Sequence, residues 1–155
     1  MKGSKKVIDG LNEALVEELT AINQYMVHAE MCEDWGYGAL HGVIHKRAID
    51  EMKHAEKLIG RIIFLEGTPI VSKLSKMHIG AAVKTQIAND LMAEQGAVAL
   101  YNKLIALATA EKDKGTEDLL SAILRDEEAH LDTIETQTDQ IAQMGLENFL
   151  NNQVG

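Results

Sequence analysis

Four stretches of the chain carry apolar residues every three or four positions, which is the spacing of one face of an α-helix. We expect helices over about residues 5–34, 39–66, 82–112 and 116–144. The turns after the first and third stretches are short and contain glycine, so each adjoining pair of helices should form an antiparallel hairpin. The pattern therefore predicts an all-α bundle of four long helices.

The segment between the second and third predicted helices has a different character. Residues 68–80 show no helical periodicity, and Gly67 ends the helix before them. A connection of this length, in a chain whose other turns are short, is typical of a crossover that runs along a bundle. Thr116 is the expected N-cap of the fourth helix. After Gly145, residues 146–151 predict a short fifth helix.

Each predicted helix carries one glutamate near the middle of its apolar row. These glutamates are Glu18, Glu51, Glu94 and Glu127. In two of the rows a histidine follows three positions later, as His54 and His130, so carboxylate and imidazole share one helix face. The two Glu-x-x-His pairs lie 76 positions apart, and the same offset relates Tyr25 to Tyr101. A polar pattern repeated at one offset predicts two similar halves.

Four buried carboxylates without partners would each cost several kcal/mol. No lysine or arginine lies in the four rows, so cations must enter the core from outside. Carboxylate oxygens with imidazole nitrogens suit iron or manganese, and the pattern matches that of di-iron and di-manganese carboxylate bundles. A single Glu-x-x-His pair is most often part of a solvated face, but two pairs in register with two further glutamates predict a dinuclear metal site. Its expected ligands are Glu18, Glu51, His54, Glu94, Glu127 and His130.

The second helix has an additional apolar row on another side, made of Ile49, Met52, Ile59 and Ile63. A helix with two apolar sides needs two packing partners, so we expect one side to meet another subunit. From this pattern alone Met52 is a packing residue, as most methionines on apolar helix faces are.

Composition narrows the function classes. The 155 residues fit one domain, 1–155, and 46% hydrophobic with 25% charged residues indicates a globular chain. A net charge of −9 argues against nucleic-acid binding, which needs clustered lysine and arginine. Cys32 is the only cysteine, which excludes an internal disulfide and any Cys-x-x-Cys metal module. No stretch resembles a membrane span or a signal peptide, so we expect no membrane partner and a cytoplasmic location.

The sequence resembles the bacterioferritins over essentially its whole length. The matching stretches are 21–25, 49–55, 64–67, 124–128 and 144–148. The resemblance implies a ferritin-like four-helix bundle with one long crossover and two irons per subunit. Glu51 and Glu127 would bridge these irons, while Glu18 with His54, and Glu94 with His130, would complete one iron each. It further implies a ferroxidase that oxidises Fe(II) to Fe(III) with O2 or H2O2 and stores the mineral in a homo-oligomeric shell of twenty-four subunits.

The resemblance also implies haem b shared between two subunits, with Met52 of each subunit as an axial ligand. This haem would assist iron release, with a ferredoxin-type protein as the electron donor. The neighbours expected to line the haem pocket are Leu19, Asn23, Met26, Ile49 and Ile59. For Tyr25 two roles are open: a buried hydrogen-bond donor that orients Glu94, or a redox-active side chain near the irons.

One departure from the family and several alternatives stand beside this interpretation. Some bacterioferritins hold iron on the cavity wall with a histidine and an aspartate. Here Asp50 keeps the aspartate, but Lys46 stands at the histidine position and neither His41 nor His45 obviously replaces it, so we do not expect that site. His28 and His78 have no predicted partner. The alternatives are a rubrerythrin-like peroxidase, a dimanganese catalase, or a haem or iron carrier with an inactive centre. The lone cysteine disfavours the rubrerythrin type. The sequence leaves open the native metal, haem occupancy, oxidant, redox partner, and whether one or two kinds of subunit form the shell.

Overall fold

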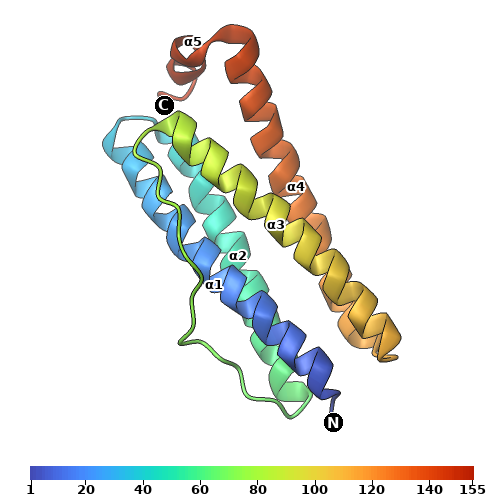
Figure 1. Ribbon diagram of the computed structural model, residues 1–155. Helices are drawn as coiled ribbons and strands as arrows, with labels where there is room; N and C mark the ends of the chain where they lie inside the picture. The colour runs from blue at the N-terminus through green and yellow to red at the C-terminus, as the bar shows by residue number, and fades with distance from the viewer.

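The computed structural model describes residues 1–155, and all of its regular secondary structure is helical. The helices are α1 (Lys5–Asp34), α2 (Gly38–Phe64), α3 (Val83–Ala110), α4 (Lys114–Met144) and α5 (Leu146–Asn151). The four long helices form a bundle, and α5 turns across one end of it (Figure 1). This confirms the predicted fold class, and each predicted helix end lies within two residues of the observed one. No helix combines the length and apolarity needed to cross a membrane.

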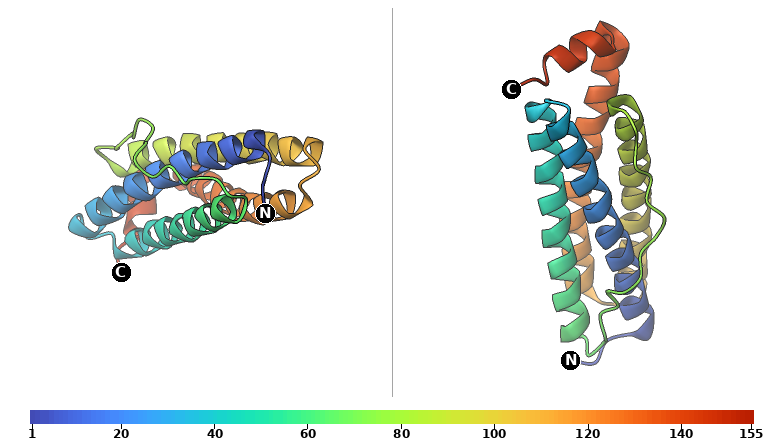
Figure 2. Two further views of the ribbon diagram at one scale, coloured as in Figure 1. Left: turned by 90° about the horizontal axis from the view of Figure 1, so that it is seen from below. Right: turned by 90° about the vertical axis from the view of Figure 1, so that its left-hand side faces the viewer.

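The crossover between α2 and α3 runs in an extended form along α1 (Figures 1 and 2). Side chains of α1 hold it by accepting hydrogen bonds from its backbone N–H groups. The pairs, acceptor first, are Asn12 with Ile70, Thr20 with Ser75, Gln24 with His78, and His28 with Gly80, at 2.9–3.0 Å. These bonds satisfy a backbone that has no helix or sheet of its own. His28, which had no predicted partner, is therefore a buried structural residue.

The apolar core consists of two clusters that are separated along the bundle axis. One contains Leu15, Leu58 and Leu104, and the other contains Ile44 and Ile134. Buried polar side chains from all four long helices lie between them, including the four predicted glutamates. The sequence pattern thus places a polar layer in the middle of an otherwise apolar bundle.

Helix α4 begins two residues earlier than predicted, and Thr116 is not its N-cap. Asp113 caps the helix, because its carboxylate accepts a hydrogen bond from the Thr116 N–H at 3.0 Å. The Thr116 hydroxyl donates to the same carboxylate and accepts from Arg61 Nε at 3.0 Å. Arg61 also donates to Asp113 at 2.9 Å, which joins the end of α2 to the start of α4.

Two details of the helix surfaces and ends bear on the predicted pattern. The helical spacing of the apolar row of α4 predicts Thr138 in that row, four residues after Ile134, but Thr138 is exposed and Gln137 is buried instead. After α2, the residue with left-handed backbone is Glu66 (φ 64°), not Gly67. Gly67 is required for space, because a Cβ there would lie 2.7 Å from Ile8 Cγ2.

Candidate metal centre

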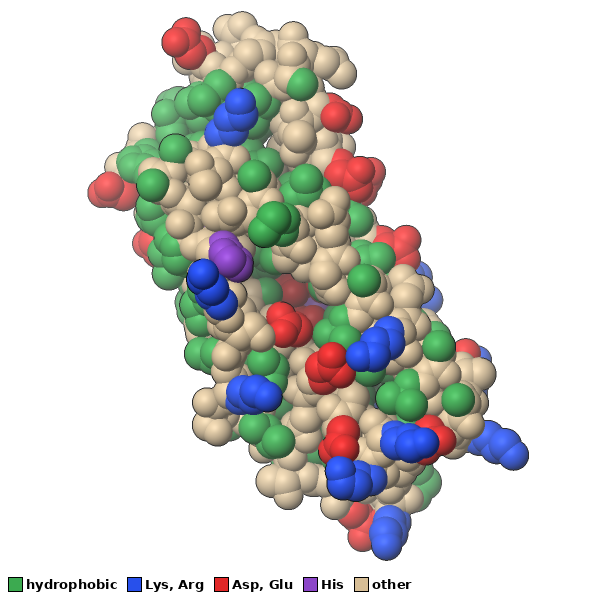
Figure 3. Space-filling view, in the orientation of Figure 1, with side chains coloured by type: hydrophobic (Ala, Val, Ile, Leu, Met, Phe, Trp, Pro, Cys, Tyr) green, Lys and Arg blue, Asp and Glu red, His purple; other side chains and the backbone are tan.

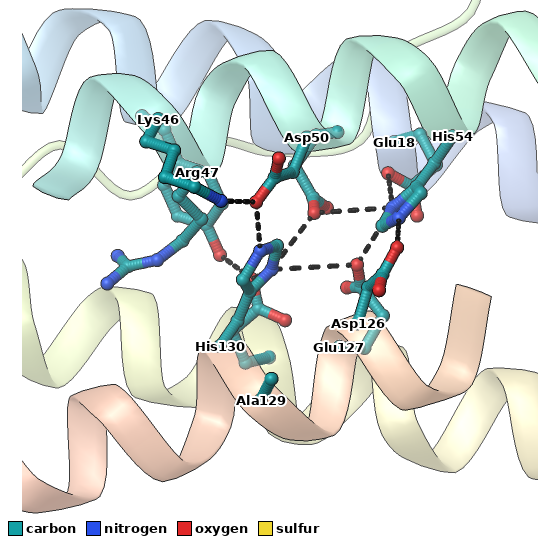
Figure 4. Close-up of polar contacts among 12 residues, drawn as sticks. Glu18, Lys46, Arg47, Asp50, His54, Asp126, Glu127, Ala129 and His130 are labelled. Atoms are coloured by element: carbon teal, nitrogen blue, oxygen red, sulfur yellow. Dashed lines mark hydrogen bonds and ion pairs between the residues drawn. The ribbon is translucent and has the colours of Figure 1, made fainter. Parts of the chain in front are cut away.

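The six predicted ligands converge in the polar layer of the bundle. Helices α1 and α3 each contribute one glutamate, and α2 and α4 each contribute one Glu-x-x-His pair (Figure 4). Two groups of four side chains result, and within each group one candidate ligand atom per residue lies within 4.8 Å of the others. The first group is Glu18, Glu51, His54 and Glu127; the second is Glu51, Glu94, Glu127 and His130. Glu51 and Glu127 belong to both groups, the position required of bridging ligands.

Each histidine directs its Nδ1 atom toward the carboxylates. His54 Nδ1 lies 3.0 Å from Glu127, 3.4 Å from Glu51 and 3.5 Å from Glu18. His130 Nδ1 lies 3.2 Å from Glu51 and 3.5 Å from Glu94. Each of the two groups of candidate ligands thus contains one imidazole nitrogen atom.

The hydrogen bonding of the cluster is incomplete in one specific way. Seven buried polar side-chain atoms of these six residues have no hydrogen-bond partner, and they include both Nδ1 atoms and at least one oxygen of each glutamate. Buried polar atoms in proteins are normally paired, so unpaired atoms that converge on one place indicate a site suited to binding cations. Oxygen and imidazole donors in this number fit two divalent ions of the iron or manganese type.

The charges of the cluster explain its titration. Burial, together with repulsion from Glu18 and Glu94, raises the pKa of Glu51 well above its usual range. Burial, partly offset by His54 and reinforced by the other carboxylates, raises the pKa of Glu127 to about 12. Burial opposes protonation of His54, but the nearby carboxylates of Glu127, Glu18 and Glu51 outweigh it and raise the pKa of His54. The cluster therefore retains protons that divalent cations would displace.

Two aspartates outside the set of six predicted ligands lie against the outer nitrogen atoms of the two histidines. His54 Nε2 lies 2.8 Å from Asp126, and His130 Nε2 lies 2.9 Å from Asp50. A carboxylate can only accept from Nε2–H, so each neutral imidazole keeps its Nδ1 lone pair for the cluster. The 76-residue offset that relates the two halves also relates Asp50 to Asp126, and this signal could have identified the pair.

Two tyrosines hold the two glutamates that belong to only one group of ligands, and each tyrosine binds a glutamate from a different helix. The Tyr25 hydroxyl donates to Glu94, and the Tyr101 hydroxyl donates to Glu18, both at 2.6 Å. Burial raises the pKa of both tyrosines well above their usual value, and the adjacent carboxylates add to this effect. The geometry accords with the hydrogen-bonding role considered for Tyr25. Tyr101, which had no predicted role, has the same role in the other half.

The two outer aspartates differ in one respect. Lys46 lies 3.0 Å from Asp50, whereas Asp126 has no lysine partner and its side chain is 54% exposed. Both aspartates line a cavity of about 410 Å³ between α2 and α4, together with His130. The ammonium group of Lys46 thus occupies the position at which the resemblance to bacterioferritins would place the histidine of a cavity-wall iron site.

A buried arginine near the cluster was also not predicted. Arg47 stacks over the Tyr25 ring at 5.2 Å, and its Nη1 lies 3.5 Å from Asp90. Asp90 in turn accepts from Gln24 at 2.9 Å and lies 2.9 Å from His28 Nδ1. This network balances Asp90 rather than the four cluster glutamates, so it leaves their need for cations unchanged.

We expect Asp126→Asn to weaken metal binding about tenfold to a hundredfold, because the amide removes the negative charge that makes His54 a stronger ligand. Calorimetric titration with Zn(II) would measure the change. Asp132→Asn, an exposed carboxylate on the same helix, is the matched control and should leave the affinity unchanged. Equal affinities in wild type and Asp126→Asn would show that the hydrogen bond to His54 does not tune the centre.

Comparison with known proteins places this geometry in context. The family model described as a ferritin-like domain matches residues 8–144. The chain is 42% identical to the bacterioferritin of Brucella melitensis over 149 residues, which cover 96% of this chain and 92% of the relative. It is 39% identical to the bacterioferritin of Rhodobacter capsulatus over the same share of each chain. It is 41% identical to a bacterial ferritin of Pseudomonas aeruginosa over 155 residues, which cover 99% of this chain and 100% of the relative.

Proposed function

This chain belongs to the bacterioferritins, and from that premise we propose that it stores iron by oxidising Fe(II) to Fe(III) at the six-residue centre. The observation that carries the proposal is the set of seven unpaired buried atoms that converge from four helices. The substrate is Fe(II), and the oxidant is O2 or H2O2. Glu51 and Glu127 are the proposed bridging ligands, while Glu18 with His54 and Glu94 with His130 each bind one iron.

The charge of the centre favours the proposed reaction. Four carboxylates attract Fe(III) more strongly than Fe(II), because the interaction energy scales with the charge of the ion. Each Fe(II) substrate gives up one electron, so two ions held side by side supply two electrons together. With two protons from solvent, these electrons reduce O2 to H2O2, or H2O2 to two molecules of water. The hydrogen bonds from Tyr25 and Tyr101 hold Glu94 and Glu18 in place during this change. Acidic side chains around a hollow midway along one face would favour cation approach (Figure 3).

The test of this proposal is the stoichiometry of fast oxidation. When Fe(II) is added in air, we expect a rapid rise of ferric absorbance that saturates at two Fe(II) per subunit. Prior loading with Zn(II), which binds the same ligands without redox chemistry, should abolish the rapid phase. Slow oxidation with no saturable phase, equal with and without Zn(II), would contradict a ferroxidase centre.

We further propose that the protein assembles into a shell of twenty-four subunits, with haem b bound between two of them by Met52. The side chain of Met52 is 48% exposed on α2, and Met26 on α1 is 45% exposed. Leu19, Ile49 and Ile59 are partly buried, and their spacing of seven residues from Met26 and of three and seven residues from Met52 places them on the same helix faces. Exposed apolar surface of this kind is typical of a subunit interface, and a thioether is a known haem ligand. A haem there would pass electrons from a ferredoxin-type donor for iron release.

Met52→Leu should abolish the haem Soret band, because leucine keeps the apolar volume but has no sulfur to bind iron. The measurement is the visible spectrum of purified protein after reconstitution with haem. Met92→Leu, which changes a methionine of 57% exposure on α3, is the matched control and should keep the band. Normal haem binding in Met52→Leu would assign the axial ligand to another residue.

A further inference from the structure

The first three turns of α2 carry two histidines that the proposed centre does not use. His41 and His45 lie one turn apart on the helix, their ring centroids are 5.5 Å apart, and the planes are tilted by 34°. They precede Glu51 by ten and six residues, which is about 15 and 9 Å along the helix axis. Two histidines at this spacing on one helix face can bind a single divalent metal ion.

The environment of His41 prepares it to bind a metal. Its Nδ1 atom lies 2.8 Å from the backbone carbonyl oxygen of Ala29 in α1. A carbonyl oxygen only accepts hydrogen bonds, so Nδ1 carries the proton and Nε2 of the neutral ring has a free lone pair. A backbone bond of this kind is the usual device that fixes the tautomer and orientation of a metal-binding histidine.

The second ring and the local charge complete the arrangement. His45 is exposed and has no hydrogen-bond partner, so its ring can turn to share an ion with His41 without breaking a contact. The carboxylate of Glu33 lies 4.0 Å from His41 Nδ1 and adds negative charge beside the pair. The start of α2 therefore offers two imidazole nitrogen donors, and the negative charge of Glu33 beside them favours a cation.

We propose that His41 and His45 form a second, solvent-accessible site for one divalent transition-metal ion. The class of ligand follows from the donors: two imidazole nitrogens with water in the remaining positions prefer Cu(II), then Ni(II) or Zn(II), over Mg(II) or Ca(II). The site is mononuclear and nitrogen-rich, whereas the buried centre is dinuclear and dominated by carboxylates. It does not depend on the ferroxidase proposal or on haem.

The test uses the full-length assembled protein with its buried centre first loaded with Zn(II). One equivalent of Cu(II) per subunit is then added, and electron paramagnetic resonance counts the nitrogen ligands. We expect two imidazole nitrogens in wild type. In His45→Gln we expect one nitrogen and a dissociation constant raised roughly tenfold or more by loss of the chelate. His78→Gln is the matched control, because His78 is exposed on the crossover with no second histidine beside it.

The outcomes separate this site from the buried centre. Unchanged Cu(II) spectra and affinity in both His41→Gln and His45→Gln would overturn the proposal, and so would an equal loss in His78→Gln. The rate of Fe(II) oxidation should be the same in His45→Gln as in wild type. If the wild-type protein showed no fast Fe(II) oxidation, the proposed ferroxidase function would be contradicted. The Cu(II) measurement would still test the histidine pair, because it does not depend on that activity.

Discussion

Glu51→Gln should slow Fe(II) oxidation by roughly a hundredfold or more. Glu51 belongs to both groups of candidate ligands and is 1% exposed, so water cannot replace the lost carboxylate charge. Removing one member of a buried set of charges costs about 3 kcal/mol or more, and each 1.4 kcal/mol is about a factor of ten. The amide keeps the shape of the side chain, so the loss reports on charge rather than on packing.

Stopped-flow absorbance with two Fe(II) per subunit would measure this effect. Glu127→Gln should behave like Glu51→Gln, because the two glutamates occupy equivalent positions in the two halves. Glu128→Gln is the matched control, since Glu128 is exposed and adjacent in sequence to Glu127. Rapid oxidation at the normal rate in both Glu51→Gln and Glu127→Gln would place the reaction elsewhere.

After treatment with a chelator, the protein should lose stability as the pH rises from about 5 to 9. The pKa of Glu127 is about 12 in the folded chain, against an ordinary value of 4.5. Between these values the folded state holds a proton that the unfolded state has released, so rising pH favours unfolding. The raised pKa of Glu51 acts in the same direction. One such group contributes up to about 1.4 kcal/mol per pH unit.

The other titrating groups do not reverse this sign. His54 and His130 also have raised pKa values, so above their ordinary value of 6.5 the folded chain keeps protons that the unfolded chain has released, and rising pH again favours unfolding. The pKa of Glu94 is lowered, mainly because His130 and Glu127 overcome the effect of burial. A lowered carboxyl pKa acts only below the ordinary value of 4.5, where falling pH removes stability. Stability without metal should therefore be greatest near pH 5.

Thermal unfolding with and without Zn(II), at one protein concentration, tests this linkage. Metal ions displace the bound protons, so the gain in Tm from Zn(II) should be larger at pH 8.5 than at pH 5.5. In Glu127→Gln the amide imitates the protonated carboxyl group, and the chelated protein should show a weaker dependence on pH. Glu128→Gln should keep the wild-type dependence. A gain in Tm that is equal at both pH values would show that the cluster holds no such protons.

The fold was predictable because each helix encodes its inward face locally. Rows such as Leu11, Leu15 and Glu18 repeat with the helical period, and short glycine-containing turns fix the hairpins. The position of the crossover against α1 was not predictable, because the hydrogen bonds that Gln24 and His28 accept from its backbone depend on tertiary proximity. The choice of Asp113 over Thr116 as a cap likewise depends on Arg61, which arrives from another helix.

The six cluster residues were identified because glutamates within apolar rows violate the ordinary pattern. Asp126 was within reach of the same reasoning, since it obeys the 76-residue offset from Asp50. The network of Arg47, Asp90 and His28 could not be predicted from spacing, because its members come from three helices and share no fixed offset in the sequence. Residue spacing reveals contacts within a helix or between repeats, whereas pairing across unrelated positions appears only in three dimensions.

Anomalous X-ray diffraction at the iron absorption edge, from crystals soaked in Fe(II) without oxygen, would locate the bound metal directly. We expect two iron peaks in the middle of the bundle, both contacted by Glu51 and Glu127. One peak should also contact Glu18 and His54, and the other Glu94 and His130. No peak among these side chains, or a single peak bound by one group only, would contradict a dinuclear ferroxidase centre.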